Sequence, residues 1–126
     1  MMKYPDAKNK SKVGSYSALV FSGGGYFYDE ILEYRVWVRP QNGDEVHFYA
    51  YADYEMALDY AQKTEGAEDP LVLVLQKTYI DEPTKGNLII VKEDRITEWR
   101  VEWLLEGKGG EGVLEAFIAK NKQDEF

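Results

Sequence analysis

The chain has 126 residues, enough for one domain that buries about two thirds of the surface its unfolded form exposes. It contains no cysteine, which excludes disulfides, thiolate metal sites and cysteine nucleophiles and is typical of a protein of the reducing cytoplasm. A formal net charge of −8 argues against nucleic-acid binding, which depends on lysine and arginine side chains that neutralise phosphates.

Residues 1–14 form the first segment of the chain. Four lysines lie there among small and polar residues, namely Lys3, Lys8, Lys10 and Lys12. This composition predicts a flexible arm or, as the alternative, an arm that contacts an acidic partner. We therefore place a single folded domain at residues 15–126. No apolar run has the length of a signal peptide or a membrane span, so we expect a soluble, cytoplasmic protein that binds no membrane.

The next segment, Ser15–Phe21, is predicted to be the first strand, and Ser22 with the three glycines at 23–25 ends it. A glycine triplet could allow a phosphate to approach the backbone amides. However, no Lys-Ser or Lys-Thr pair follows, and the next residues have a strand pattern. The triplet therefore favours a bulge or tight turn, which uses backbone angles that glycine adopts most easily.

A β-hairpin is predicted over residues 33–51. Side chains alternate from Glu33 to Arg39, and Asn42-Gly43 favours a two-residue type I′ turn. This register pairs Val38 with His47, Val36 with Tyr49, and Tyr34 with Tyr51. One face then carries Tyr34, Val36, Val38, His47, Tyr49 and Tyr51, and the other carries Arg35, Trp37, Arg39, Val46, Phe48 and Ala50. A slip of one residue would exchange the faces of one strand.

The main helix is predicted at residues 54–65. Asp53 is a good N-cap, and Gly66 supplies the C-terminal stop. The spacing i, i+3, i+4, i+7 places Tyr54, Ala57, Leu58 and Ala61 on the face that covers the sheet. Glu55, Asp59, Gln62 and Lys63 should then face water.

Three further strands and a second helix complete the predicted fold. The apolar run 71–75 is typical of a strand buried on both faces, so we expect it at the centre of the sheet. Residues 81–87 form a predicted turn, 88–91 a strand, and 96–105 a strand. In this last strand Thr97, Trp99, Val101, Trp103 and Leu105 should lie in the core, and Glu98, Arg100 and Glu102 in a solvated strip. After a glycine-rich loop, Val113, Leu114, Phe117 and Ile118 predict a short C-terminal helix.

These elements predict an α+β fold. It has an antiparallel or mixed sheet of five or six strands, the main helix packed on the sheet, and the short C-terminal helix.

Candidate functional residues are concentrated in the hairpin and the segment before it. His47 and Tyr49 are the candidates for catalysis, and Tyr26, Tyr28, Tyr34, Arg35, Arg39 and Tyr51 are the candidates for ligand binding. The tyrosines also have a structural interpretation, because tyrosine favours half-buried strand positions. No metal site is predicted, since the acidic pairs lack metal-loop spacing. A nucleophile elbow of the form Gly-x-Ser-x-Gly is also missing from the sequence.

Several strings of the chain resemble a group of small bacterial proteins often labelled GNAT-family N-acetyltransferases. They are the run from Gly23 to Trp37, Gly66–Leu73, Tyr79–Pro83 and Arg95–Leu104. The resemblance implies acetyl-CoA as a cofactor, with its pyrophosphate held on a loop of pattern Gln/Arg-x-x-Gly-x-Gly/Ala between a strand and a helix. Gly107, Gly110 and Gly112 correspond to this loop, although the first position departs from the pattern.

Two functions follow from these observations. The first is a binding or interaction module without a cofactor, which uses the aromatic face of the hairpin toward a small molecule or a protein. A homodimer through an exposed sheet edge is one form of this hypothesis. The second is the acetyl-CoA-dependent N-acetyltransferase that the resemblance implies.

Overall fold

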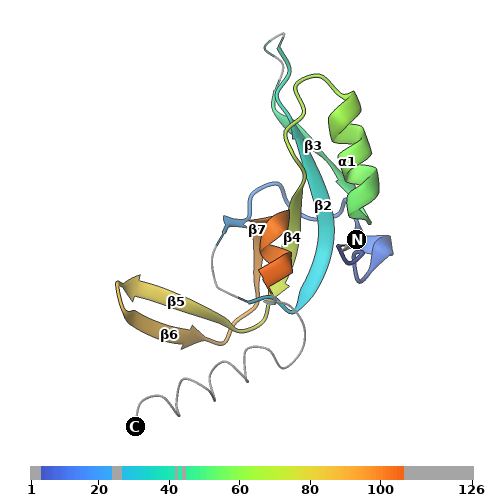
Figure 1. The fold of residues 1–126 in the computed structure, drawn as a ribbon. Helices are drawn as coiled ribbons and strands as arrows, with labels where there is room; N and C mark the ends of the chain where they lie inside the picture. The colour runs from blue at the N-terminus through green and yellow to red at the C-terminus, as the bar shows by residue number, and fades with distance from the viewer. Residues whose placement is uncertain (1–3, 24–26, 42, 44, 107–126) are drawn as a thin grey trace.

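The fold is α+β, as predicted. A computed structural model of the chain describes residues 4–23, 27–41, 43 and 45–106. A five-stranded mixed sheet has the order β1-β7-β4-β2-β3, and a two-stranded sheet, β5-β6, extends away from it (Figure 1). The strands are β1 (Phe21–Ser22), β2 (Glu30–Val38), β3 (His47–Tyr51), β4 (Leu71–Gln76), β5 (Tyr79–Thr84), β6 (Asn87–Val91) and β7 (Arg95–Arg100). The helices are α1 (Tyr54–Lys63) and two 3-10 helices, η1 (Lys10–Lys12) and η2 (Val101–Glu106).

The hairpin β2-β3 has the predicted register. Val38 pairs with His47, Val36 with Tyr49, and Tyr34 with Tyr51 in an antiparallel ladder. The strands stop at Val38 and start again at His47. Asn42, the first residue of the predicted turn, lies outside the described residues.

Strand β4 lies at the centre of the sheet, as its apolar sequence predicts. It pairs antiparallel with β2 on one side and with β7 on the other. Val72, Leu73 and Val74 are fully buried, so both faces of the strand are covered. The core combines Val72 and Val74 with Val36 and Trp99 on the face that carries α1.

Helix α1 begins where the sequence indicates and ends slightly earlier than predicted. The Oδ1 of Asp53 accepts a hydrogen bond from the amide of Met56 at 2.8 Å, and the helix ends at Lys63 instead of residue 65. Gly66 follows with a φ of +83°, and a Cβ there would lie 2.6 Å from the carbonyl oxygen of Arg39. Glycine is therefore required both by the backbone angle and by the close approach to the hairpin.

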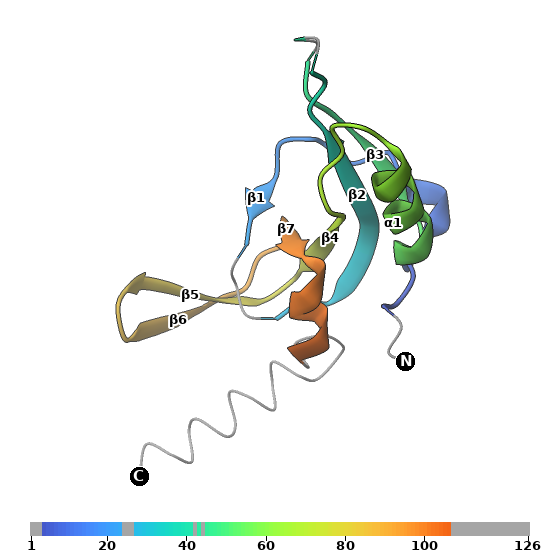
Figure 2. The ribbon, with the colours of Figure 1, turned by 45° about the horizontal axis from the view of Figure 1, so that its top comes forward.

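The prediction of a strand over Ser15–Phe21 is wrong. Only Phe21–Ser22 form a strand, and they pair parallel with β7. The carbonyl of Ser17 accepts a hydrogen bond from Arg35 Nη2 at 2.5 Å, and the Ser17 hydroxyl accepts one from the amide of Leu19 at 3.0 Å. Side chains thus take the place of a strand ladder, and the segment crosses the sheet to reach β1 (Figure 2).

The predicted strand over residues 96–105 is too long. Strand β7 ends at Arg100, and the chain turns into η2. Both Val101 and Leu104 are buried in the core, and Trp103 packs on Trp99 with ring centroids 5.9 Å apart. A spacing of three residues puts two side chains on the same side of a helical turn but on opposite faces of a strand. Burial of both side chains therefore favours the turn.

The turn predicted over residues 81–87 is narrower than expected. Strand β5 continues to Thr84, the turn is made at Lys85-Gly86, and Gly86 has a φ of +84°. Strand β6 confirms the strand predicted at 88–91. The predicted C-terminal helix at 113–118 lies outside the described residues.

The described part of the N-terminal segment lies against the sheet. The amide of Ala7 donates to the carbonyl of Ala52 at 2.7 Å, and the amide of Lys8 donates to the carbonyl of Ile31 at 2.9 Å. The hydroxyl of Tyr34 donates to the carbonyl of Pro5. The flexibility of residues 1–14 stays a prediction, but these contacts attach residues 5–8 to the folded domain. Within the described ranges, no helix is long and apolar enough to span a membrane.

Candidate binding surface between strand β3 and helix α1

Four aromatic side chains form a continuous cluster across β3 and α1. His47, Tyr49 and Tyr51 alternate along β3 and so point to one face of the sheet. The ring of Tyr49 lies 5.3 Å from that of His47 and 5.0 Å from that of Tyr60, and Tyr51 lies 5.8 Å from Tyr60. We call these four residues the aromatic cluster.

The helix meets the strand in this way because of one small side chain. Ala57 is fully buried and lets α1 pack on β2 and β3. Met56 and Tyr60 are four residues apart, so they lie one above the other on the same side of the helix. Tyr60 turns toward β3, where it completes the row of rings.

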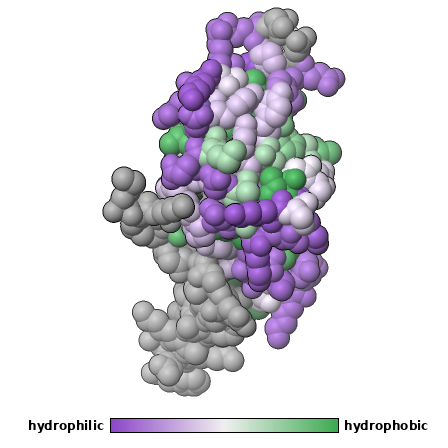
Figure 3. All heavy atoms as spheres, turned by 90° about the vertical axis from the view of Figure 1, so that its right-hand side faces the viewer, coloured by the Kyte–Doolittle hydropathy of each residue, from purple (hydrophilic) through white to green (hydrophobic). Residues whose placement is uncertain are grey.

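A surface groove adjoins the aromatic cluster. Its volume is about 440 Å³, and it is lined by Tyr51, Glu55, Met56, Asp59, Tyr60 and Lys63. Beside the groove, Tyr49 is 46% exposed, and Met56 in the groove lining is 57% exposed, so both side chains are accessible from solvent. Seen from the α1 side, hydrophobic and near-neutral residues occupy the middle of the molecule, with hydrophilic residues above and below (Figure 3).

The charges of the groove come from helix α1. Burial raises the pKa of Tyr51, and nearby Tyr60, Tyr49 and Asp59 raise it further, so this phenol is neutral at neutral pH. The Nζ of Lys63 lies 2.9 Å from Asp59 Oδ1, in an exposed pair one helical turn apart. The groove lining thus carries two carboxylates, those of Glu55 and Asp59, and one ammonium group, that of Lys63.

The two residues predicted for catalysis belong to the aromatic cluster. His47 and Tyr49 are both exposed, and the Nδ1 of His47 lies 3.1 Å from the carbonyl oxygen of Glu45. The part of the chain that the structure describes holds no group of three or more His, Asp or Glu residues that could bind a metal ion.

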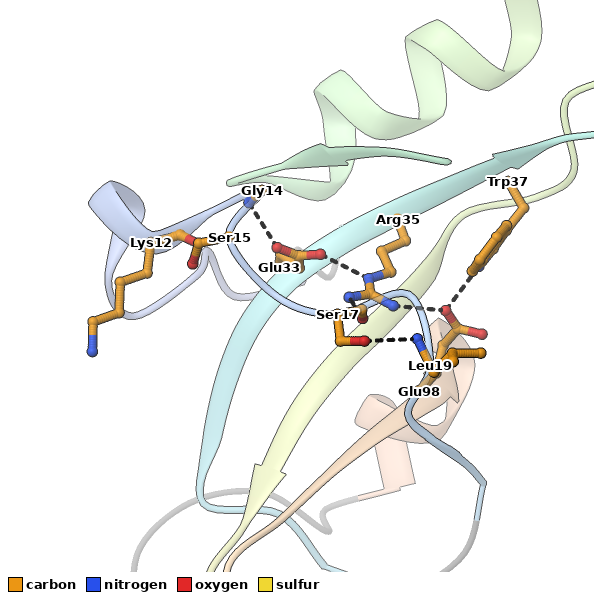
Figure 4. A network of polar contacts seen from close by, with 9 residues as sticks. All are labelled: Lys12, Gly14, Ser15, Ser17, Leu19, Glu33, Arg35, Trp37 and Glu98. Carbon is orange, nitrogen blue, oxygen red and sulfur yellow. Dashed lines mark hydrogen bonds and ion pairs between the residues drawn. The ribbon is translucent and has the colours of Figure 1, made fainter. Parts of the chain in front are cut away.

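Arg35, predicted to bind a ligand, lies on the opposite face of the hairpin (Figure 4). It is fully buried, and its Nε donates to Glu33 Oε2 at 2.7 Å. Its Nη1 lies 3.6 Å from Glu98 Oε2, and the guanidinium stacks 4.2 Å above the ring of Phe48. Protein groups thus enclose Arg35, and it is inaccessible from the aromatic cluster.

The two carboxylates around Arg35 have further hydrogen bonds. Glu33 Oε1 accepts from the amide of Gly14 at 2.8 Å, and Glu98 Oε2 accepts from Trp37 Nε1 at 2.8 Å. Glu98 was expected in a solvated strip, and this prediction is wrong because Arg35 and Trp37 draw its side chain toward the interior, where it is only 15% exposed. We call Glu33, Arg35 and Glu98 the buried ion cluster.

The other predicted site residues are dispersed. Tyr34 is fully buried under α1, and its burial raises its pKa well above the usual range. Tyr28 packs edge-on against Trp99 at 5.6 Å, and burial raises its pKa as well. Arg39 is exposed and pairs with Glu68. Tyr26, Gly107, Gly110 and Gly112 lie outside the described residues, and the chain approaches this glycine loop through η2 instead of the expected strand.

Compared with known proteins, the chain matches no family model, no curated protein and no solved structure. The acetyltransferase resemblance therefore stays a prediction. The structure brings together three of the predicted residues, His47, Tyr49 and Tyr51. It adds Tyr60, Met56 and Asp59, which the sequence analysis did not select. Their signal in the sequence was a second helical row, with Met56 and Tyr60 four residues apart and just outside the predicted buried face.

Proposed function

We propose that this protein is a binding module that recognises another protein through the aromatic cluster and the adjoining groove. The observation that carries this proposal is the row of contacting, partly exposed rings His47, Tyr49, Tyr60 and Tyr51. Tyrosine supplies a large apolar contact area together with a hydroxyl, and for this reason it is enriched at protein interfaces and among their energetically dominant residues.

A protein partner suits this surface better than a small molecule does. The rings extend along β3 beyond the groove as far as His47, whereas pockets for small molecules enclose most of the ligand surface. Met56 adds an exposed, adaptable side chain at the groove, and methionine is common at surfaces that bind peptides. We place this activity in the cytoplasm, which the absence of cysteine favours.

Selection of peptides from a random display library tests the proposal. The bait is the full chain, and enriched peptides are then titrated against the wild type, Tyr49→Ala and Tyr60→Ala. Loss of one central aromatic side chain should weaken binding by about 2 kcal/mol, roughly thirty-fold in Kd. Leu19→Ala is the control, because Leu19 is 91% exposed and belongs to the segment on the Arg35 face of the hairpin (Figure 4).

The proposal predicts peptides that depend on Tyr49 and Tyr60 and not on Leu19. It is rejected if the selection enriches no peptide, or only peptides that bind both tyrosine variants as well as the wild type. Sedimentation of the same samples tests the homodimer, since a dimer through this surface should dissociate in the Tyr49→Ala variant.

A further inference from the structure

Strand β3 is an open edge of the main sheet. Among the described residues it pairs only with β2, and no backbone hydrogen bond from another segment reaches residues 47–51. Every second residue of such a strand directs its N–H and C=O away from its neighbour. The opposite edge strand, β1, has only two residues and is thereby protected.

Strand β3 lacks two of the usual devices that protect a sheet edge, namely proline and charged side chains such as lysine. Its sequence, His-Phe-Tyr-Ala-Tyr, contains no lysine, no proline and no carboxylate. Natural proteins protect exposed edges with charges, proline, bulges or a covering segment. An exposed sheet edge can accept an extended peptide as an added strand, with backbone hydrogen bonds that give affinity and side-chain pockets that give specificity.

On the basis of the proposed function, we propose that the partner is a basic, extended segment that adds as a strand to the edge of β3. A lysine or arginine of this segment enters the groove, where it contacts the rings of Tyr51 and Tyr60 and the carboxylates of Glu55 and Asp59.

The geometry connects the edge to the groove. Alternate side chains of an added strand point to the α1 side, because successive residues of a strand face opposite sides of the sheet. Tyr51 belongs both to β3 and to the groove lining, so the groove adjoins the strand edge. A long side chain at one alternate position of the partner therefore reaches the groove while its backbone pairs with β3.

The chemistry of the groove favours a cation. Tyrosine rings attract cations at their faces, and Glu55 and Asp59 supply negative charge one helical turn apart. Lys63 shows that an ammonium group fits beside Asp59 Oδ1, at 2.9 Å. This exposed pair contributes little stability, so a partner cation can displace Lys63. The net charge of −8 attracts a basic partner over longer distances.

The inference is tested with a defined probe, an acetylated and amidated heptapeptide in which lysine alternates with valine. The second peptide has glutamate in place of lysine, and the third is the lysine peptide N-methylated at alternate residues to remove the N–H donors of one edge. Each peptide is titrated into the full chain labelled with ¹⁵N. The lysine peptide should shift the amides of residues 47–51 and 55–63. N-methylation should raise the Kd of the lysine peptide about ten-fold or more, equivalent to about 1.4 kcal/mol, and the glutamate peptide should not bind.

Surface variants separate the charge contribution from the strand pairing. The double variant Glu55→Gln with Asp59→Asn should lower the affinity for the lysine peptide about ten-fold. Lys63→Gln should raise this affinity about three-fold, because it frees Asp59. All three side chains are exposed, so the fold is preserved, and thermal unfolding of each variant checks this.

Failure of this inference and failure of the proposed function give different results. If the glutamate peptide binds as tightly as the lysine peptide, or if N-methylation has no effect, the inference is overturned. The proposed function still stands in that case if displayed peptides depend on Tyr49 and Tyr60. If no peptide of the three binds, the inference is overturned as well, and the display selection alone decides on the proposed function.

Discussion

The two faces of the β2-β3 hairpin have similar residues but differ in how far the rest of the chain covers them. On one face, Arg35, Trp37 and Phe48 lie under the N-terminal segment and around the buried ion cluster. On the other face, His47, Tyr49 and Tyr51 lie beside α1, which leaves their row of rings partly open to solvent. Both faces combine aromatic rings with polar groups, so composition does not distinguish them. The difference comes from the segment that covers each face.

The comparison indicates separate roles for the two faces. The covered face fixes the N-terminal segment, because Glu33 Oε1 accepts from the amide of Gly14 and Arg35 Nη2 donates to the carbonyl of Ser17. Arg35 Nε donates to Glu33 Oε2 within the same strand. The α1 face contributes to folding through Tyr34 and Val36, which are fully buried in the core, but the aromatic cluster on the same face retains surface for a partner. Substitutions in the buried ion cluster should therefore affect stability most, and those in the aromatic cluster should affect binding.

The largest effect is expected from Arg35→Met, which should lower the free energy of unfolding by about 3–5 kcal/mol. The variant leaves the carboxylate of Glu33 buried without its cation, and a buried charge without a partner is costly. Chemical denaturation measures the change. Arg39→Met is the matched control, because the exposed pair of Arg39 with Glu68 should contribute less than about 1 kcal/mol. Equal effects of the two substitutions would contradict the importance of the covered face.

The second effect, from Phe48→Ala, should be a loss of about 2 kcal/mol of stability. Phe48 packs on Trp37 with ring centroids 4.9 Å apart and covers the Arg35 guanidinium at 4.2 Å. The value is below that for a fully buried phenylalanine because the side chain is only half-buried. Peptide binding by the folded variant should stay within about two-fold of wild type, since Phe48 faces away from the aromatic cluster. A large loss of peptide affinity in a fully folded Phe48→Ala variant would show that the two faces are coupled.

The third effect concerns Tyr34, at the covered end of the α1 face. Burial raises its pKa above the ordinary value of about 10, so above pH 10 the unfolded chain loses this proton while the folded chain keeps it. Stability should therefore be constant below pH 10 with respect to this group, and fall by up to about 1.4 kcal/mol per pH unit above it. Tyr34→Phe should lower stability by about 1 kcal/mol at neutral pH, through the lost bond to Pro5, and make the alkaline decline shallower.

Denaturation at several pH values between neutral and strongly alkaline measures this slope. Tyr28→Phe is the comparison, because Tyr28 is only half-buried and its pKa is also raised by burial. It should flatten the decline less than Tyr34→Phe does. A Tyr34→Phe slope equal to that of wild type would show that Tyr34 ionises alike in the folded and unfolded chains.

The sequence predicted the elements whose pattern is local. The alternation of β2 and β3 predicted their register, the apolar run of β4 predicted its central position, and Asp53 predicted the start of α1. The errors arose where distant groups decide the conformation. Ser15–Val20 has a strand-like composition, but Arg35 binds the carbonyl of Ser17. The end of β7 depends on burial of both Val101 and Leu104, which no local pattern shows.

The candidate site was predictable to a similar extent. The aromatic strand directed attention to His47, Tyr49 and Tyr51, and these three residues do lie together. Arg35 was expected with them, but the period of two places it on the opposite face, and only the path of the N-terminal segment reveals that this face is covered. Tyr60 joins the aromatic cluster because α1 crosses close to β3, which depends on tertiary packing at Ala57.

The smallest effect on stability, and the most direct test of the comparison, is expected from Tyr49→Ala. Tyr49 follows Phe48 directly on β3 but points to the open face, where half of its surface is already in contact with water. Its removal should lower the free energy of unfolding by about 1 kcal/mol, less than Phe48→Ala, since nearly half of Tyr49 is already exposed to solvent in the folded chain. The substitution should nevertheless raise the Kd of the peptides selected by display about thirty-fold, because Tyr49 lies in the middle of the row of rings. Adjacent substitutions would then separate the two properties, with Phe48→Ala reducing stability and Tyr49→Ala reducing affinity. A Tyr49→Ala variant that unfolds as readily as Phe48→Ala would instead mean that the open rings are part of the core, and that the aromatic cluster serves the fold.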